Sequence, residues 1–115
     1  MRKQMIENAA YEVATQVRAV EDTIDTALAE IAELQLKMIN ARGVAGVGVQ
    51  TGHDALEQLA GALQGLVHAR GSMAGCHAAL VHAKDKVPGL RTTMFGDGDE
   101  CPKTAEITPA LRVVA

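Results

Sequence analysis

The chain has 115 residues, a formal net charge of −3 and two aromatic residues, Tyr11 and Phe95. This length fits one domain at most, and the acidic balance argues against a nucleic-acid-binding protein, which usually carries a concentrated basic surface. Because large aromatic side chains dominate many globular cores, we expect a thin core made by helices in close contact.

Apolar residues recur at alternating steps of four and three from the N-terminus to about residue 41, without an intervening Gly or Pro. This spacing predicts a helix over about residues 3–41 with an apolar seam that a partner helix must cover. One register of the seam holds Ala10, Val17, Ile24, Ile31 and Met38, and the other holds Ile6, Val13, Val20, Ala27 and Leu34. A second apolar set lies beside the seam and predicts contact with at least two other helices; it consists of Leu28, Ala32, Leu36 and Ile39.

Residues 43–52 contain four glycines, which do not sustain a helix. We predict a compact interhelical loop here. The alternation of Val44, Val47 and Val49 leaves a short strand as the alternative reading. A phosphate-binding loop is disfavoured because the Gly-Lys-Ser/Thr pattern is absent.

A second helix is predicted over about residues 53–86, with Thr51 or Asp54 as its cap and Lys84 and Lys86 in its last turn. Pro88 and the glycine that follows end it. Two long helices with a short connection predict an antiparallel helical hairpin over residues 1–89. Residues 90–115 contain two further prolines and an acidic turn over 96–100, and we predict an irregular tail there.

The heptad spacing continues in the second helix, where it includes Leu56, Leu59, Leu63, Leu66, Met73, Leu80 and Val87. In the same frame three polar residues take seam positions: Arg70, His77 and Lys84. We interpret this as a drift of the seam toward Val67, Ala74 and Val81. The alternative is that Arg70 and His77 lie at the rim of the seam and specify register or partner.

The second helix also carries glycines at 61, 65, 71 and 75, each of which costs up to about 1 kcal/mol relative to Ala in a helix interior. A stripe of small residues lies along this helix, on which another helix can approach closely and recover dispersion energy. The small-residue stripe consists of Gly61, Gly65, Ser72, Cys76, Ala79 and Ala83. We therefore predict that the hairpin self-associates into a helical bundle, with a dimeric four-helix bundle as the smallest assembly. The predicted interface residues are Val17, Ile24, Leu28, Ile31, Leu36, Ile39, Leu59, Gly61, Gly65, Leu66, Ser72, Cys76 and Ala79.

We predict no metal or cofactor. The histidines and cysteines lack the three- or four-residue helical spacing of metal ligands, and there is no Cys-x-x-Cys pair. The acidic turn lacks the further ligands of a calcium loop, and Ser72 lacks the Gly-x-Ser-x-Gly context of a hydrolase nucleophile. A site assembled across subunits stays open, with candidates His68, His77, His82, Cys76 and Cys101.

The segment from Val67 to Gly75 resembles the phospho-accepting region of histidine phosphotransfer domains, which are helical bundles of similar size. The resemblance implies a signalling protein that accepts phosphate on His68. Arg70 and Gly71 follow the histidine by two and three residues, whereas the basic residue and the glycine of the family follow by three and four.

The function that the sequence favours is non-enzymatic: an oligomeric structural subunit, adaptor or small regulator that acts through helix-helix contacts, with itself or another protein as partner. A bacterial or phage accessory protein fits this composition, and a phage virion or assembly component is a further alternative. We expect a cytoplasmic protein, since the sequence shows neither a secretory signal nor an apolar run long enough for a membrane span. The acidic residues of the first helix are interpreted as a solvated face, with docking of a basic partner as the alternative.

Overall fold

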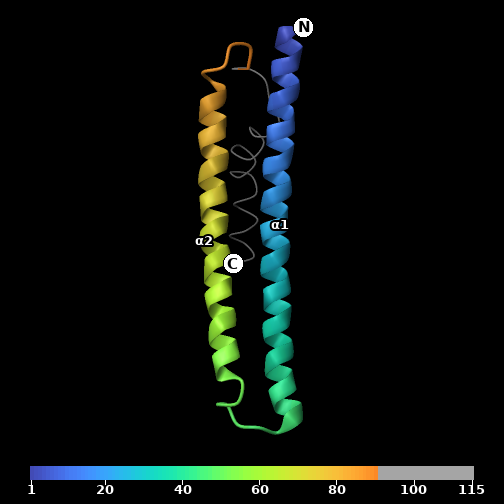
Figure 1. Ribbon diagram of the computed structural model, residues 1–115, viewed down its shortest axis with the longest axis vertical. Helices are drawn as coiled ribbons and strands as arrows, with labels where there is room; N and C mark the ends of the chain where they lie inside the picture. The colour runs from blue at the N-terminus through green and yellow to red at the C-terminus, as the bar shows by residue number, and fades with distance from the viewer. Residues whose placement is uncertain (91–115) are drawn as a thin grey trace, which may run out of the picture. The chain divides into compact units, whose positions relative to one another are not determined.

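The computed structural model describes residues 1–90, which form two α-helices, α1 (Arg2–Ala45) and α2 (His53–Lys84), joined by a loop over residues 46–52 (Figure 1). The helices pack against each other as a helical hairpin, and residues 1–90 contain no strand. The predicted all-α hairpin is thus confirmed, as is a loop in place of the alternative strand. The predicted tail and its acidic turn lie outside the described residues, except for Leu90.

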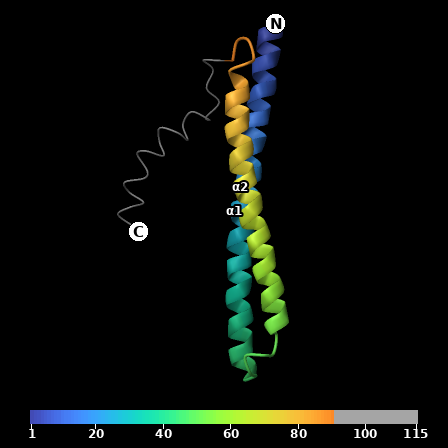
Figure 2. The same cartoon turned by 90° about the vertical axis from the view of Figure 1, so that its left-hand side faces the viewer.

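The hairpin divides into two compact units. Unit 1 combines Met1–Arg18 with the chain from His77 onward, and unit 2 is Ala19–Cys76. Each unit contains one segment of α1 and one segment of α2, and Figure 2 shows the two helices from a second direction. Each unit therefore has its own stretch of the seam between the helices.

The apolar seam of α1 follows the predicted heptad. The first register is half-buried throughout, at Ala10, Val17, Ile24, Ile31 and Met38. In the second register Ile6, Val20 and Ala27 are half-buried, whereas Val13 is 49% exposed and Leu34 is 48% exposed. No residue of α1 or α2 is fully buried. A single partner helix therefore covers a narrow strip of α1 and leaves its flanks open.

The seam of α2 keeps to one heptad frame for most of its length, and the predicted drift is wrong at two of its three positions. Val67 is 54% exposed and Ala74 is exposed, whereas Val81 is half-buried. The leucines of the original frame are half-buried at 56, 59, 63 and 66. The frame persists because long polar side chains occupy the edge of the seam: His77 and Lys84 are half-buried, and their aliphatic or ring atoms cover apolar surface.

Helix α1 ends at Ala45, four residues later than predicted, and includes Gly43. The actual stop is Gly46, whose φ of 68° places it in the left-handed region that glycine adopts without a Cβ clash. The Gly46 N–H donates to the carbonyl of Arg42 at 3.0 Å, which satisfies one of the last carbonyls of the helix. The last turn of α1 tolerates Gly43, and for this reason a boundary predicted from glycine content falls four residues too early.

Helix α2 begins at His53, as predicted. The residue at its N-cap position is Gly52, and neither Thr51 nor Asp54 takes that position. The carbonyl of Gly52 (φ 82°) accepts the first helical bond, from the Leu56 N–H at 3.2 Å. Asp54 lies instead in the first turn, where a carboxylate favours the positive end of the helix dipole.

At its other end α2 stops at Lys84, two residues before the predicted residue 86. The next three N–H groups, those of residues 85–87, donate to carbonyls three residues earlier at 3.0–3.2 Å, which is the tighter geometry of a 3₁₀ turn. This turn leads through Gly89 to Leu90, which is 4% exposed and is the single buried hydrophobic residue of the described part of the chain.

Candidate functional site

The structure separates the predicted interface residues into two groups. Six are half-buried within the hairpin's own seam: Val17, Ile24, Leu28, Ile31, Leu59 and Leu66. Seven are exposed: Leu36, Ile39, Gly61, Gly65, Ser72, Cys76 and Ala79. The second group is the part of the predicted interface that remains accessible to another chain.

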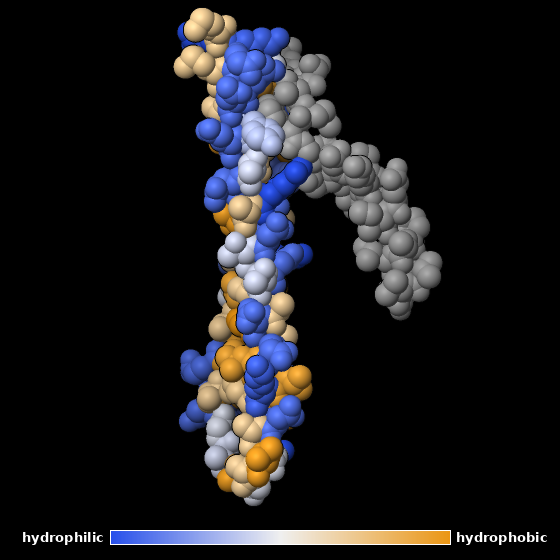
Figure 3. Space-filling model, turned by 90° about the vertical axis from the view of Figure 1, so that its right-hand side faces the viewer, coloured by the Kyte–Doolittle hydropathy of each residue, from blue (hydrophilic) through white to orange (hydrophobic). Residues whose placement is uncertain are grey.

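Two exposed apolar residues share one face of the α1 segment of unit 2. Leu36 is 54% exposed and Ile39 is 44% exposed, and they lie about 60° apart around the helix. Leu34, which is 48% exposed, belongs to the seam and lies roughly 150° away from them. Figure 3 shows apolar side chains gathered in the lower part of the view, toward the end of the hairpin that carries the loop. Leu36 and Ile39 are therefore the part of this face that another chain could cover.

The loop end of unit 2 adds a groove of about 460 Å³, lined by apolar residues that include Met38, Val47, Val49 and Leu56. The Arg42 Nη1 donates a hydrogen bond to the Val47 carbonyl at 3.1 Å. This bond links the last turn of α1 to the loop. Val49 is 68% exposed, so the loop presents apolar surface of its own.

The small-residue stripe of α2 faces away from α1. A Cβ built on Gly61 or Gly65 would have no neighbouring atom within 4 Å. The same holds for Gly71 and Gly75. The hairpin itself therefore gives no packing reason for glycine at these positions, although each glycine weakens the helix relative to alanine.

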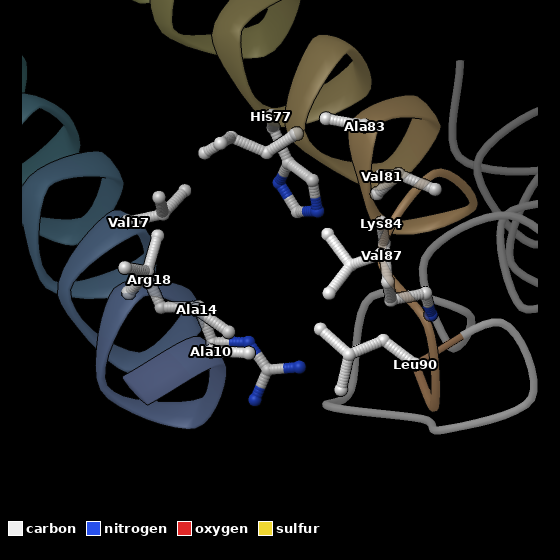
Figure 4. Close-up of a pocket in the computed structure, with 12 residues that line it drawn as sticks. Ala10, Ala14, Val17, Arg18, His77, Val81, Ala83, Lys84, Val87 and Leu90 are labelled. Atoms are coloured by element: carbon white, nitrogen blue, oxygen red, sulfur yellow. The ribbon is translucent and has the colours of Figure 1, made fainter. Parts of the chain in front are cut away.

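Unit 1 contains a groove of about 220 Å³ between its two helical segments (Figure 4). Ala10, Ala14 and Val17 line it from α1, whereas Val81 and Ala83 line it from α2. Alanine side chains at adjacent turns do not fill the space that the heptad spacing provides, and the groove results from this shortfall in volume. Sequence analysis missed it, although the alanines at 10 and 14 were its signal.

Unit 2 contains an ion pair between its two helices. Arg70 Nε donates to Asp25 Oδ1 at 2.6 Å, across a separation of 45 residues in sequence. The hydrogen bond from Arg70 and its positive charge lower the pKa of the Asp25 carboxyl below the ordinary value of 3.8. The pKa of Arg70 is raised for the same reasons. This contact supports the alternative in which Arg70 lies at the seam's rim and helps to set the register of the helices.

The histidines are not gathered into one site. His53 lies 3.5 Å from Glu57 on its own helix, and His68 and His82 are exposed on α2. Within residues 1–90 no group of three or more histidine, cysteine or acidic side chains is close enough to hold a metal ion. The cross-subunit site remains a prediction. Phosphotransfer through His68 also remains a prediction; the nearby Arg70 guanidinium, which would contact the phosphate in that role, is bound to Asp25.

In the described part of the chain, neither helix combines the length and the apolar content needed to cross a membrane. Comparisons with protein-family models, with curated proteins and with solved structures gave no significant match.

Proposed function

We propose that this chain is a non-enzymatic interaction protein that self-associates through the faces of α1 and α2 that its hairpin leaves open. The observation that carries the proposal is the lack of burial: no residue of either helix is buried, although the seam has the regular spacing of a packed bundle. Two helices supply too few neighbours to enclose side chains on all sides, and a second hairpin supplies the missing ones.

Two surfaces of unit 2 are suited to this role. On α1 the half-exposed Leu36 and Ile39 would gain burial. Since full burial of such a side chain contributes about 1.5–3 kcal/mol, hiding the remaining half contributes about 1 kcal/mol each. On α2 the glycines at 61 and 65 offer a smooth surface, which lets a helix approach with its backbone close. Self-association would explain why glycine occupies exposed helical positions.

A matched pair of variants tests the stripe. Gly65→Leu and Gly71→Leu make the same change in the same helix, and neither added side chain meets an atom of the hairpin. Both should gain helix propensity of up to about 1 kcal/mol. By the 100° rotation per residue, position 71 lies roughly 120° around the helix from position 65. Light-scattering mass at micromolar concentration should therefore fall toward that of a single chain for Gly65→Leu and stay oligomeric for Gly71→Leu.

A monodisperse single-chain mass for the unmodified protein, with cooperative unfolding, would contradict self-association. An oligomeric mass that both variants retain would remove the stripe from the interface and leave the apolar face of α1 as its site.

The exposed Cys76 carries a free thiol, which is compatible with a reducing compartment. We propose that the protein acts in the cytoplasm, as a structural subunit, adaptor or small regulator.

A further inference from the structure

His53 and Glu57 form a polar pair on the first two turns of α2. The His53 Nε2 lies 3.5 Å from the Glu57 Oε1, and the two side chains are 54% and 64% exposed. A spacing of four residues places both side chains on one face of the helix. Among the four histidines of the chain, His53 alone has a carboxylate four residues before or after it. The pair therefore combines two metal-binding groups at a spacing that helices use to bind zinc.

The distance between the two ligand atoms fits a zinc ion. Zinc binds histidine nitrogen at about 2.0–2.1 Å and carboxylate oxygen at about 2.0–2.2 Å, in a tetrahedral arrangement, which separates neighbouring ligand atoms by about 3.4 Å. The Nε2 of His53 and the Oε1 of Glu57 are 3.5 Å apart, so an ion can replace their direct contact with little movement of either side chain. The imidazole binds the ion in its neutral form, and any proton that it carries beforehand is released to solvent.

One chain supplies half of the ligands that such an ion takes. Structural zinc sites have four protein ligands, and within residues 1–90 no group of three or more histidine, cysteine or acidic side chains is close enough to hold a metal ion. A second copy of the chain carries the same pair and can supply the other two ligands. Two histidines and two glutamates then surround the ion, and the two carboxylates balance its double positive charge.

The pair lies at the end of unit 2 where apolar surface is open. His53 lines the groove at the loop end, and at the same end Val44 is 90% exposed and Val49 is 68% exposed. A second copy that covers this surface brings its own loop end alongside, because a two-fold axis places the same patch of both copies in contact. Residues beside such an axis meet their own counterparts, which is the arrangement that a shared ion requires.

We propose that His53 and Glu57 are half of a zinc site, which the same pair of a second copy completes around one ion on a two-fold axis. The site rests on the proposed self-association and adds to it a contact at the loop end that depends on the ion. Each copy contributes one imidazole nitrogen and one carboxylate oxygen.

Calorimetric titration of the full-length chain with zinc chloride near neutral pH tests the ligands. A Cys76→Ser, Cys101→Ser background keeps the two thiols of the chain, which also bind zinc, out of the measurement. We expect one ion for every two chains, and His53→Gln and Glu57→Gln should each weaken zinc binding at least tenfold.

Two matched variants control for the loss of an imidazole or a carboxylate elsewhere on α2. His68→Gln removes an exposed histidine, and Asp54→Asn removes an exposed carboxylate beside the pair; both should bind zinc as the background chain does. Binding that survives His53→Gln would overturn the site. One ion for each chain, lost in His53→Gln, would show that the pair binds zinc without a second copy and would overturn the shared site.

Light-scattering mass with zinc and with the chelator EDTA separates this site from self-association itself. Zinc should lower the concentration at which the oligomer dissociates at least tenfold, and His53→Gln should abolish this effect. An oligomer that dissociates at the same concentration in zinc and in EDTA would overturn the shared site and leave self-association standing. A single-chain mass in both solutions would contradict self-association and the shared site together. A single chain in EDTA that doubles its mass in zinc would support the shared site and make self-association dependent on the ion.

Discussion

The two units share one heptad spacing but fill it with side chains of different size. Unit 2 has its groove at the loop end; away from that end its seam contains Ile24 and Ile31 from α1 and Leu63 and Leu66 from α2, all half-buried. In unit 1 the corresponding stretch of α1 contains alanines at 10 and 14, and the space between the helices remains open as a groove. The comparison teaches that the spacing decides which face of a helix meets its partner, whereas side-chain volume decides whether the seam closes.

The largest effect is expected from a charge placed in the closed seam. Ile24→Asp should lower the free energy of unfolding by about 3 kcal/mol or more, because it removes apolar burial and places a carboxylate between the helices. Thr26→Asp is the matched control, since Thr26 is also β-branched but exposed. Urea denaturation followed by circular dichroism measures both. A folded Ile24→Asp variant as stable as Thr26→Asp would show that the seam of unit 2 is not the stabilising contact.

A smaller effect separates the two seams directly. Val20 in unit 2 and Val17 in the groove of unit 1 are both half-buried residues of α1. Val20→Ala should cost about 0.5–1 kcal/mol more than Val17→Ala, because methyl groups that face open space already lack part of their contacts. The shared change in helix propensity cancels in this comparison. Equal losses of unfolding free energy, measured in urea at one pH, would indicate that the groove wall is as tightly packed as the seam.

These particular residues also show how far the sequence determines the fold. Heptad spacing and the glycine-rich loop were sufficient to predict both helices and the start of α2 at His53. The end of α1 was misplaced because glycine at 43 is tolerated inside the helix, while Gly46 supplies the left-handed residue that stops it. Sequence patterns indicate that residues lie on one face of a helix, but they carry no direct information on what faces them.

The contacts between the helices were harder to predict than the helices themselves, because a sequence pattern does not show which residue of the partner helix faces a given side chain. Arg70 was recognised as a candidate for setting the register, but its partner Asp25 lies 45 residues earlier and could not be identified from local spacing. The drift of the seam toward Val67 was predicted on the assumption that polar residues leave an apolar seam. The structure shows instead that Arg70 stays at the edge, where its guanidinium binds a carboxylate. A prediction of the groove in unit 1 would have required knowledge of which alanines face each other across the two helices.

The smallest expected effect concerns the ion pair between Arg70 and Asp25 in unit 2. The lowered pKa of Asp25 means that the folded state favours the charged carboxylate. The resulting stability is present above the pKa of the unfolded state and is lost as pH falls through the lower pKa of the folded state. Because both side chains are more than half exposed, solvent and salt screen the pair, and its contribution should be far below that of Ile24.

Asp25→Asn should therefore weaken the hairpin slightly near neutral pH and not at all at a pH well below 3.8, the ordinary pKa of this group. The measurement is the urea midpoint of the variant and the unmodified chain across this range, at low and at high salt. Asp22→Asn removes the same charge from an exposed position of α1 and controls for the change in net charge. If the two variants follow the same pH dependence, the pair contributes only through net charge. If near neutral pH Asp25→Asn is less stable than the unmodified chain while Asp22→Asn is not, and if salt and acid both reduce this gap, the contact between Arg70 and Asp25 stabilises the register of unit 2.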